Sequence, residues 1–447
     1  MGNSFRSIVV RCSGLPVRYP GLACAGPASR LPGFFRPPRR AGGLAVLAAA
    51  VALACAATAI PAAAEPAGDV VRIGVSNDRS GIYADVGGPG SEAATRLAVK
   101  DFGGQVLGKR IEVIGADTQN KADVASAVVR RWFDTQNVVA VVDGGASSTG
   151  LAAAYVAKEK NGTALISGGF AGDFSGKQCS TVTTQWAPDT YALANAVVRG
   201  AVDQGGKSWY FITSDYVFGK SLEANASHFV ERAGGKVLGS ARHPLGATDF
   251  ASFILQAQAS QAQVIGLASA GGDLVNLIKQ AQEFGLAGSR QRMLTFLTFI
   301  TDVAAMGLPV AQGLIFPDAF YWDADDDTRA WTRRWQKEAN WDRVPSIVHA
   351  LSYVATMHYL QAVQAAGTFD GEAVNRKLRE LPVTTRLIKN ARVRPEDGRV
   401  IMDLYLVEVK KPAESRYPGD FYRILSTVPG DKVFVSLADS ECPLARK

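Results

Sequence analysis

Residue types that many enzyme sites depend on are scarce in this chain of 447 residues. It has four histidines and five cysteines, and three of the cysteines lie within residues 1–64. The other two, Cys179 and Cys442, are too few for a cysteine-based metal site. His349 and His358 lie nine positions apart in a predicted helix, a spacing that suits neither a zinc site nor a catalytic triad. The sequence therefore predicts no metal ion and no cofactor.

The motifs of nucleotide-binding and hydrolytic enzymes are also absent from the sequence. No Gly-x-Gly-x-x-Gly follows the first predicted strand, and no phosphate loop occurs. Residues 266–271, Gly-Leu-Ala-Ser-Ala-Gly, are similar to a hydrolase nucleophile elbow, but Ser269 stands one place out of the Gly-x-Ser-x-Gly register. These absences argue against an enzymatic function.

Basic residues exceed acidic ones, 48 to 41, but the excess lies at one end of the chain. Residues 1–64 contain seven arginines and no acidic residue, which leaves 41 basic and 41 acidic residues in the remainder. A formally neutral body gives no sign of the basic surface that nucleic-acid binding requires. We therefore expect no nucleic-acid partner.

The arginine-rich end has the features of an export signal. An arginine pair precedes an alanine-rich apolar run, 41–60, and three alanines offer small residues for cleavage before Glu65. The run is about long enough to span a membrane, so an uncleaved anchor is the alternative. Residues 52–55, Ala-Leu-Ala-Cys, also match a lipoprotein box weakly. We assign residues 1–64 to a signal segment and expect the protein in the periplasm.

Export implies an oxidising compartment, in which two cysteines form a natural pair. Once the signal segment is removed, Cys179 and Cys442 are the cysteines that remain. We therefore predict one disulfide, which ties the C-terminal tail back to the body of the protein.

The chain after the signal alternates between strand and helix patterns. The predicted strands are 70–76, 110–116, 138–142 and 163–167, and the predicted helices are 91–102, 122–136 and 151–158. This order predicts a parallel, doubly wound α/β sheet. Ligands bind such sheets beyond the carboxyl ends of the strands. Those ends supply Asn77, Asp117, the turn 144–149 and the loop 168–170.

The same alternation restarts after Pro188 and predicts a second α/β lobe. Its predicted helices are 189–204, 220–233, 249–260 and 274–284, and its predicted strands are 208–213, 236–240, 263–267, 292–297 and 312–316. Three further helices are predicted at 325–339, 346–366 and 371–381, followed by a strand at 399–409 and an irregular tail to Cys442.

One stretch, residues 141–151, connects the predicted first sheet to a function. An apolar strand stops there at two glycines, and Ser147, Ser148 and Thr149 follow before the helix expected at Leu151. Backbone N–H groups at the helix start, together with these hydroxyls, would face a carboxylate or another anionic group. Serine and threonine are also ordinary helix caps, so the pattern alone leaves both interpretations open.

The order and spacing of these segments resemble the leucine/isoleucine/valine-binding branch of the periplasmic substrate-binding proteins that serve ABC importers. The resemblance covers roughly residues 70–409. It is carried by Ile73-Gly-Val, Ser80-Gly-Ile-Tyr83, Ser147-Ser148-Thr149, Leu165-Ile-Ser167-Gly-Gly, Asp215-Tyr216-Val-Phe218-Gly219 and Lys279-Gln-Ala-Gln-Glu-Phe-Gly285.

This resemblance implies a type I periplasmic-binding fold, in which two doubly wound lobes joined by three crossovers close on a ligand. The first lobe would comprise residues 68–187 and 318–400, and the second 188–317 and 401–447. It further implies a monomer that captures a small carboxylate-bearing ligand, an amino acid or an aromatic or branched acid. The receptor would deliver this ligand to the membrane permease of an ABC importer.

The resemblance also assigns roles to individual residues. Ser147, Ser148 and the loop at Gly169 would hold the ligand carboxylate, and Asp273 would meet its ammonium group. The pocket walls fall on Tyr83, Phe170, Tyr216 and Phe218.

The sequence departs from the family pattern at two anchors, because Ala146 and Ala171 stand where the family has a serine and a threonine. Phe170 also adds a ring where a small residue is usual. This combination favours a larger, flatter and more apolar acid than leucine. The alternative in the same fold is the ligand-sensing component of a signalling system, which would need a membrane or signalling segment after the lobes.

Overall fold

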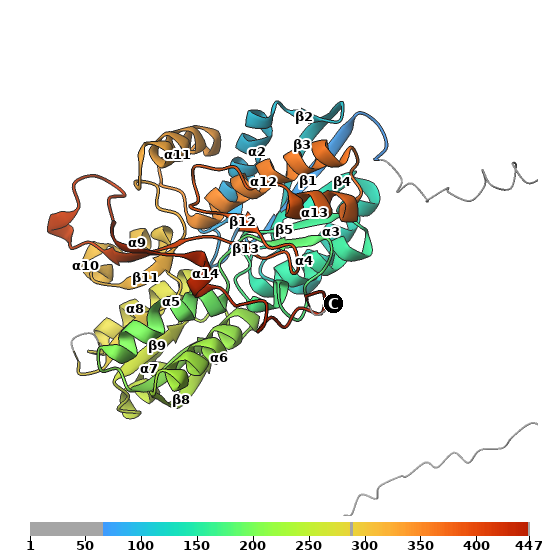
Figure 1. Cartoon of the computed structure of the whole chain (residues 1–447). Helices are drawn as coiled ribbons and strands as arrows, with labels where there is room; N and C mark the ends of the chain where they lie inside the picture. The colour runs from blue at the N-terminus through green and yellow to red at the C-terminus, as the bar shows by residue number, and fades with distance from the viewer. Residues whose placement is uncertain (1–65, 287–288, 446–447) are drawn as a thin grey trace, which may run out of the picture. The chain divides into compact units, whose positions relative to one another are not determined.

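The computed structural model describes residues 66–286 and 289–445. The predicted signal segment, 1–64, lies outside these ranges. Among the described helices, none combines the length and the apolar character of a membrane span. Two mainly parallel sheets and a smaller antiparallel sheet form the framework, and Figure 1 shows the helices that cover them.

The first sheet has six strands in the order β2-β3-β1-β4-β5-β6. All neighbours pair in parallel except the short edge strand β2, which pairs antiparallel with β3. The strands are β1 Val70–Asn77, β2 Gln105–Val106, β3 Lys109–Asp117, β4 Val138–Asp143, β5 Thr163–Ile166 and β6 Thr183–Gln185. The prediction of a parallel, doubly wound sheet is confirmed.

Helices cover both faces of this sheet, and β4 shows how the sequence encodes that arrangement. Val139 and Val142 belong to the core that includes helices α2 (Gly88–Phe102) and α12 (Ile347–Ala366). Val138 and Val141 belong instead to the core with α3 (Ala122–Thr135) and α4 (Ser147–Glu159). Because neither face meets water, the strand is a continuous apolar run rather than an alternating one.

The second sheet has four parallel strands in the order β10-β9-β7-β8. A third sheet, β11-β14-β15, is antiparallel and shares a core with the second, since Phe316 and Tyr422 cluster with Ile212 and Leu267. The strands are β7 Ser208–Ser214, β8 Lys236–His243, β9 Val264–Ala268, β10 Arg292–Thr295, β11 Ile315–Asp318, β14 Leu404–Val409 and β15 Tyr422–Val428. We refer to the first sheet and its helices as the first lobe, and to the second and third sheets and theirs as the second lobe.

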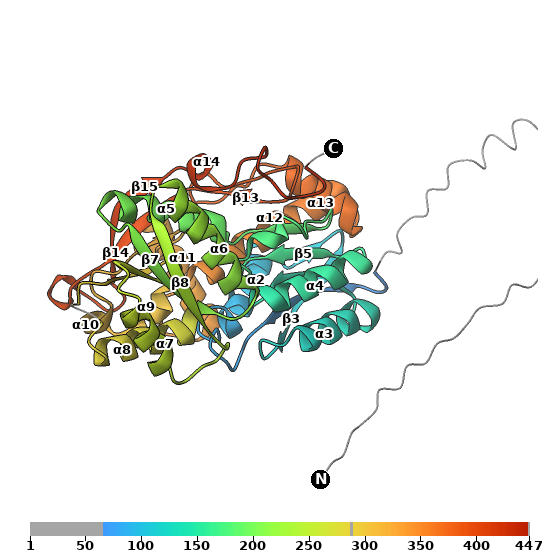
Figure 2. The same cartoon turned by 90° about the horizontal axis from the view of Figure 1, so that it is seen from below.

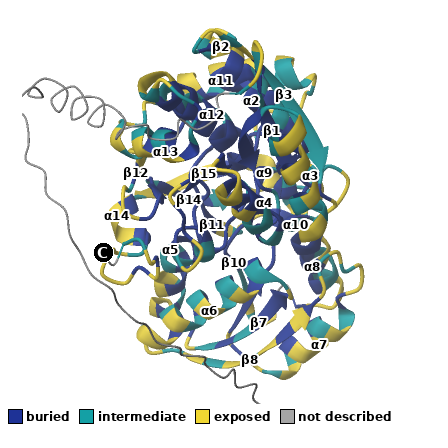
Figure 3. Ribbon diagram, turned by 90° about the vertical axis from the view of Figure 1, so that its right-hand side faces the viewer, coloured by how far each residue is buried: buried dark blue, intermediate teal, exposed yellow. Residues whose placement is uncertain are grey.

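The remaining elements surround these sheets, and Figure 3 shows that α6 and α7 expose their outer faces while β7 is mostly buried. In the second lobe they are α5 Thr190–Asp203, α6 Val217–Arg232, α7 Ala251–Ala259, α8 Gly271–Glu283, α9 Ile300–Met306, α10 Leu308–Ala311, η2 Pro412–Glu414 and α14 Gly430–Val433. In the first lobe they are η1 Gly172–Phe174, α11 Asp326–Ala339, α13 Gly371–Glu380, β12 Arg392–Val393 and β13 Val400–Ile401.

The chain passes between the lobes three times: at 186–189 before α5, at 319–325 before α11, and at 402–403 before β14. The three crossovers expected for this fold are therefore present. The finer lobe boundaries, 68–187 with 318–400 and 188–317 with 401–447, stay a prediction.

A buried arginine joins two of these crossovers. The guanidinium of Arg399 is fully buried and forms an ion pair with Asp189, N to O 2.8 Å. It also donates to the carbonyl of Ala187 (2.6 Å), to the hydroxyl of Ser175 (2.8 Å) and to the side-chain oxygen of Gln185. Burial lowers the pKa of Arg399, and the carboxylate of Asp189 opposes that shift.

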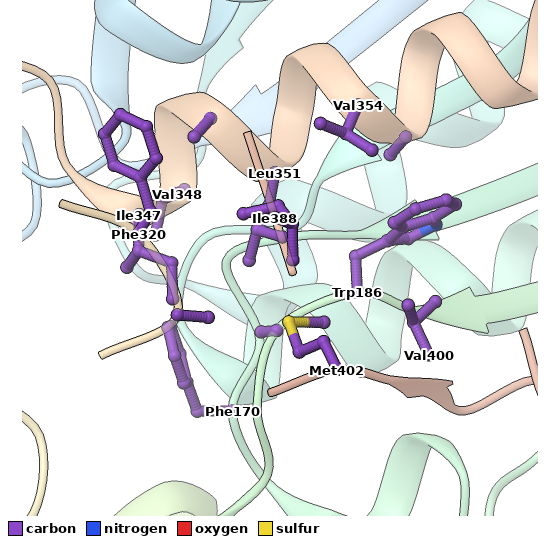
Figure 4. Packing of buried hydrophobic residues seen from close by; sticks show 14 of the residues in the cluster. Phe170, Trp186, Phe320, Ile347, Val348, Leu351, Val354, Ile388, Val400 and Met402 are labelled. Carbon is purple, nitrogen blue, oxygen red and sulfur yellow. The ribbon is translucent and has the colours of Figure 1, made fainter. Parts of the chain in front are cut away.

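Apolar side chains enclose this polar cluster. Figure 4 shows Trp186 from the first crossover and Met402 from the third packed on the side of α12 that presents Leu351 and Val354. Trp186 and Met402 are fully buried. Water is thus excluded from the crossovers, which strengthens the ion pair between Arg399 and Asp189.

The third sheet differs from the sequence-based prediction. The strand predicted at 312–316 is β11, which lies three residues later and runs antiparallel to β14 instead of continuing the second sheet. The single strand predicted at 399–409 is broken at 402–403, where the chain changes lobe. The tail predicted as irregular contains β15, which has no apolar periodicity because it is an edge strand with most residues exposed.

A disulfide joins Cys179, which precedes β6, to Cys442 in the tail, with their Cα atoms 5.7 Å apart. This is the pairing predicted from the cysteine count. The two residues are 263 positions apart in the chain.

The position of Arg399 leads to a stability prediction. Arg399→Ala leaves Asp189, which is 2% exposed, without its cation. We expect the free energy of unfolding to fall by about 3–5 kcal/mol, because an unpaired buried carboxylate is costly. Urea denaturation measures the change.

Arg386→Ala is the matched control, because Arg386 pairs with Asp327 on the surface and its side chain is 82% exposed. We expect that variant to lose less than about 1 kcal/mol. Equal losses in the two variants would contradict the role given to Arg399.

Candidate ligand-binding site

A narrow cavity lies at the carboxyl end of the first sheet, where loops of both lobes meet. Its walls come from the ends of β1, β4 and β5, from the starts of α2, α4, α6 and α8, and from α12 and the segment after β10. The residues that line it are Asn77, Asp78, Tyr83, Val86, Gly87, Gly88, Asp143, Gly145, Ala146, Ser147, Gly168, Phe170, Tyr216, Phe218, Ala270, Leu297, Phe299 and Val348. Most of these are apolar or aromatic, as in small-molecule sites.

A single carboxylate shapes the loop that carries Tyr83. Asp78 accepts hydrogen bonds from the backbone N–H groups of Gly81 (2.7 Å) and Tyr83 (2.9 Å) and from the side-chain amide of Asn120 (2.6 Å). The loop between β1 and α2 is therefore held in one conformation, and Tyr83 is presented toward the second lobe.

The floor of the cavity is built on Asp143, the last residue of β4, whose backbone has φ +78°. Its carboxylate accepts from Asn77 Nδ2 at 2.7 Å and from the N–H of Gly145 at 3.2 Å, and burial raises its pKa. A Cβ at Gly168 would stand 2.0 Å from Asp143 Oδ1, and one at Gly87 would stand 2.7 Å from Oδ2. Both glycines are thus needed for the backbone to approach this carboxylate.

Helix α4 begins at Ser147, four residues before the predicted start at Leu151. Gly144 and Gly145, at φ +87° and +62°, make the turn, and the three hydroxyl residues occupy the first helical turn. Thr149 Oγ1 donates to the carbonyls of Gly144 and Ala146, both at 2.7 Å, and so ties the first turn of the helix to the glycine turn. The predicted strand, tight turn and helix N-terminus are confirmed, and the first residue of the helix differs from the prediction.

The N-terminus of α4 has no side-chain cap, because its N-cap position is Ala146. Ser147 Oγ accepts from the N–H of Ala171 at 3.1 Å, so the hydroxyl is held at the cavity wall and its proton can be donated. Unpaired N–H groups and a fixed hydroxyl at a helix start favour an anionic group.

Aromatic rings close the cavity across the lobes. The hydroxyls of Tyr83 and Tyr216 lie 2.7 Å apart, one from each lobe. Phe170 meets Phe299 edge-on, with ring centroids 5.7 Å apart. Burial raises the pKa of both tyrosines, so both hydroxyls keep their protons at neutral pH.

The backbone also joins the lobes beside this tyrosine pair. The N–H of Gly272, in the first turn of α8, donates to the carbonyl of Ile82 at 3.0 Å. A Cβ at Gly271 would stand 2.7 Å from the ring of Tyr83. Glycine at the start of α8 therefore permits this close approach.

The predicted site residues separate into two groups. Tyr83, Ser147, Phe170, Tyr216 and Phe218 line the cavity together. Ser148, Gly169 and Asp273 are not among the lining residues, so their predicted ligand contacts stay predictions. Phe218 lies in the first turn of α6 rather than in the predicted loop, because α6 begins at Val217.

Asp273 lies deeper than its predicted role suggests. It is 1% exposed and sits in the first turn of α8, which begins three residues before the predicted start. One oxygen accepts from the N–H of Gly246 at 3.0 Å, and the other has no hydrogen-bond partner among the described residues. Burial raises its pKa to about 6.

Several lining residues were not foreseen. Asp143 and Phe299 each follow a predicted strand, so the rule that sites lie at carboxyl ends could have found them. Val348 comes from α12, and no local pattern places that helix beside the cavity. Within the described ranges, histidine, cysteine and acidic residues form no group of three or more that could hold a metal ion.

Comparison with known proteins identifies the family. A family described as periplasmic binding protein matches residues 70–415. The chain belongs to the periplasmic binding protein family. A comparison with curated proteins found no match.

Solved structures agree with this assignment. A periplasmic binding protein from Burkholderia mallei is 44% identical, with a TM-score of 0.81, over 84% of this chain and 99% of that one. A branched chain amino acid ABC transporter periplasmic ligand-binding protein from Burkholderia xenovorans LB400 is 34% identical, with a TM-score of 0.74, over 84% of this chain and 100% of that one.

A solved structure with lower sequence identity has the same fold. The solute binding protein of an ABC transporter from Rhodopseudomonas palustris BisB5, in complex with 3,4-dihydroxy benzoic acid, is 20% identical with a TM-score of 0.71. The match covers 81% of this chain and 98% of that one.

A buried acid behind the cavity makes the stability of the fold depend on pH. Asp302 of α9 is 4% exposed and accepts from the N–H of Phe299 at 3.0 Å. Burial raises its pKa from 3.8 to about 7. From about pH 4 to about pH 7 the folded state thus keeps a proton that the unfolded state has lost, so this contribution to stability falls as pH rises.

In the Asp302→Asn variant the side chain at this position cannot ionise. The variant therefore does not lose this contribution to stability as the pH rises. We expect the stability of the variant relative to wild type to increase between about pH 5 and about pH 8. Chemical denaturation of both proteins at the two pH values measures the difference. The same difference at both pH values would contradict the assignment.

Proposed function

We propose that this periplasmic binding protein captures a small carboxylate-bearing ligand between its lobes and delivers it to the membrane permease of an ABC importer. The ligand is an amino acid or an aromatic or branched acid. The observation that carries the proposal is the uncapped start of α4, with Ser147 beside it, facing a cavity walled by aromatic rings from both lobes.

The carboxylate end of the ligand lies at α4. The helix start offers backbone N–H groups, and Ser147 Oγ is already oriented by the N–H of Ala171. Asp78 and Asp143 also reach the cavity, but their oxygens are occupied by backbone and amide donors. We therefore expect the ligand carboxylate at the start of α4, where the helix N–H groups and Ser147 Oγ are available.

The other end of the ligand is apolar and flat. Phe170, Phe299, Tyr216 and Phe218 provide ring faces and edges, and Ala146 and Ala171 bring no hydroxyl. Aromatic walls of this kind favour aromatic or branched side chains. The relative from Burkholderia xenovorans is named for branched chain amino acids, and the fold holds 3,4-dihydroxy benzoic acid in the protein from Rhodopseudomonas palustris.

Ligand entry requires the lobes to separate. Little space remains between the lining side chains, and the Tyr83–Tyr216 contact spans the cavity. Opening at the crossovers parts these hydroxyls, and closure around the ligand brings them together again. In this scheme the lobes move as units, and the protein acts as a monomer.

A thermal-shift screen across amino acids, branched acids and benzoates identifies the ligand class. A ligand that binds only the folded state raises the melting temperature, by an amount that depends on its concentration relative to Kd. We expect shifts with branched or aromatic carboxylates and none with the matching amides. Chemical turnover of the ligand that binds would point to an enzyme instead.

Two cavity variants test the site once a ligand is known. We expect Ser147→Ala and Tyr83→Ala each to weaken binding about tenfold, the effect of losing one buried hydrogen bond or one ring contact. Isothermal titration calorimetry measures Kd, and circular dichroism checks the fold.

The matched controls for these variants are Ser252→Ala and Tyr155→Ala. Both residues are exposed, and Tyr155 is 62% exposed. We expect Kd unchanged in both controls. An unchanged Kd in both cavity variants would refute the site.

We further propose that residues 1–64 are removed on export, so that the mature protein begins at Glu65. The alanines before Glu65 suit a signal peptidase. N-terminal sequencing of protein from the periplasmic fraction tests this, and a retained apolar run 41–60 would support an anchor instead.

A further inference from the structure

The chain after β15 forms a strap, residues 429–442, that starts in the second lobe and ends in the first. Near its start, α14 packs on α5, where Asn195 Nδ2 donates to the carbonyls of Lys432 (3.0 Å) and Val433 (3.1 Å). Its end is Cys442, which is fully buried and bonded to Cys179. Figure 2 shows this red segment running from α14 toward α13.

The two ends of the strap are attached to different sheets. β15 pairs with β14, whose Val407 and Val409 are packed with the second sheet. Cys179 lies in the segment between η1 and β6, and β6 is the edge strand of the first sheet. The strap is therefore a fourth connection between the lobes, in addition to the three crossovers, and a covalent bond closes it.

The middle of the strap rests on the crossovers. The ring of Phe434 lies 5.4 Å from the guanidinium carbon of Arg399, the residue that joins two crossovers. Arg394 Nη1 donates to the carbonyl of Val435 at 2.6 Å, and Asp397 holds the same guanidinium. A rotation of one lobe relative to the other at the crossovers must therefore also displace the strap.

We propose that the strap, closed by the Cys179–Cys442 disulfide, limits how far the two lobes open. The crossovers alone are three single backbone segments that can turn about their own bonds. A fourth connection fixed at both ends resists any rotation that lengthens the path from β15 to Cys179. Cleavage of the disulfide removes this limit and leaves the ligand cavity itself unchanged.

One backbone hydrogen bond reports on opening without any ligand. The N–H of Gly272 donates to Ile82 across the lobes, so its hydrogen exchange requires the lobes to part. Strand β7 lies at the centre of the second sheet, and exchange of its amides reports on unfolding of that lobe. The proposal thus concerns hinge motion and can fail independently of the proposed ligand class.

Hydrogen–deuterium exchange with mass spectrometry compares the mature protein with Cys179→Ala/Cys442→Ala. We expect the peptide that contains Gly272 to exchange about fivefold faster in the variant, with β7 unchanged. Equal exchange at Gly272 would overturn the proposal.

A second modified protein distinguishes the effect of the strap from the local effect of the disulfide. It also tests the proposal if the double variant does not fold. A protease site placed at residues 436–439, which are exposed, allows the folded protein to be cut with the disulfide intact. We expect the cut to accelerate exchange at Gly272 as the double variant does. Unchanged exchange at Gly272 after the cut, or equal acceleration in β7, would overturn the proposal.

Discussion

The ion pair between Arg399 and Asp189 is the interaction on which the arrangement of the lobes depends. One oxygen of Asp189 meets the guanidinium, and the other accepts from the N–H of Ala192 at 2.8 Å and so caps α5. A single carboxylate therefore links the first helix of the second lobe to a residue beside β6 of the first. Burying two charges is costly, and the cost is offset here because the guanidinium also donates hydrogen bonds to the carbonyl of Ala187, the hydroxyl of Ser175 and the side chain of Gln185.

The geometry of the cavity depends on how the ion pair between Arg399 and Asp189 holds the crossovers. Its floor is rigid because Asp143 is enclosed by backbone, with Gly87 and Gly168 as the residues that permit the approach. Its far wall is contributed by Tyr216 and Phe218 at the start of α6, whose position depends on the second lobe. The site thus has one half that is preformed and one half that is placed by the angle at the crossovers.

The sequence predicts the strands and helices whose buried residues form a regular apolar pattern. β4 and α12 are long apolar patterns, and they lie within a few residues of where they are expected. Arg399 could not be assigned to the hinge, because an arginine at the start of an alternating stretch normally faces solvent. Val348 reaches the cavity only through the packing of α12 against distant elements, which no local sequence pattern predicts. The helix start at Ser147 was missed because serine and threonine fit a turn and a first helical turn equally well.

The position of the disulfide in the chain sets an order of events during biosynthesis. Cys179 is made 263 residues before Cys442, so its thiol stays unpaired while the whole second lobe is synthesised. The bond can form only after β15 has emerged and the strap has reached the first lobe. Oxidation is therefore a late step, and a chain stopped before Cys442 would keep a free thiol beside β6.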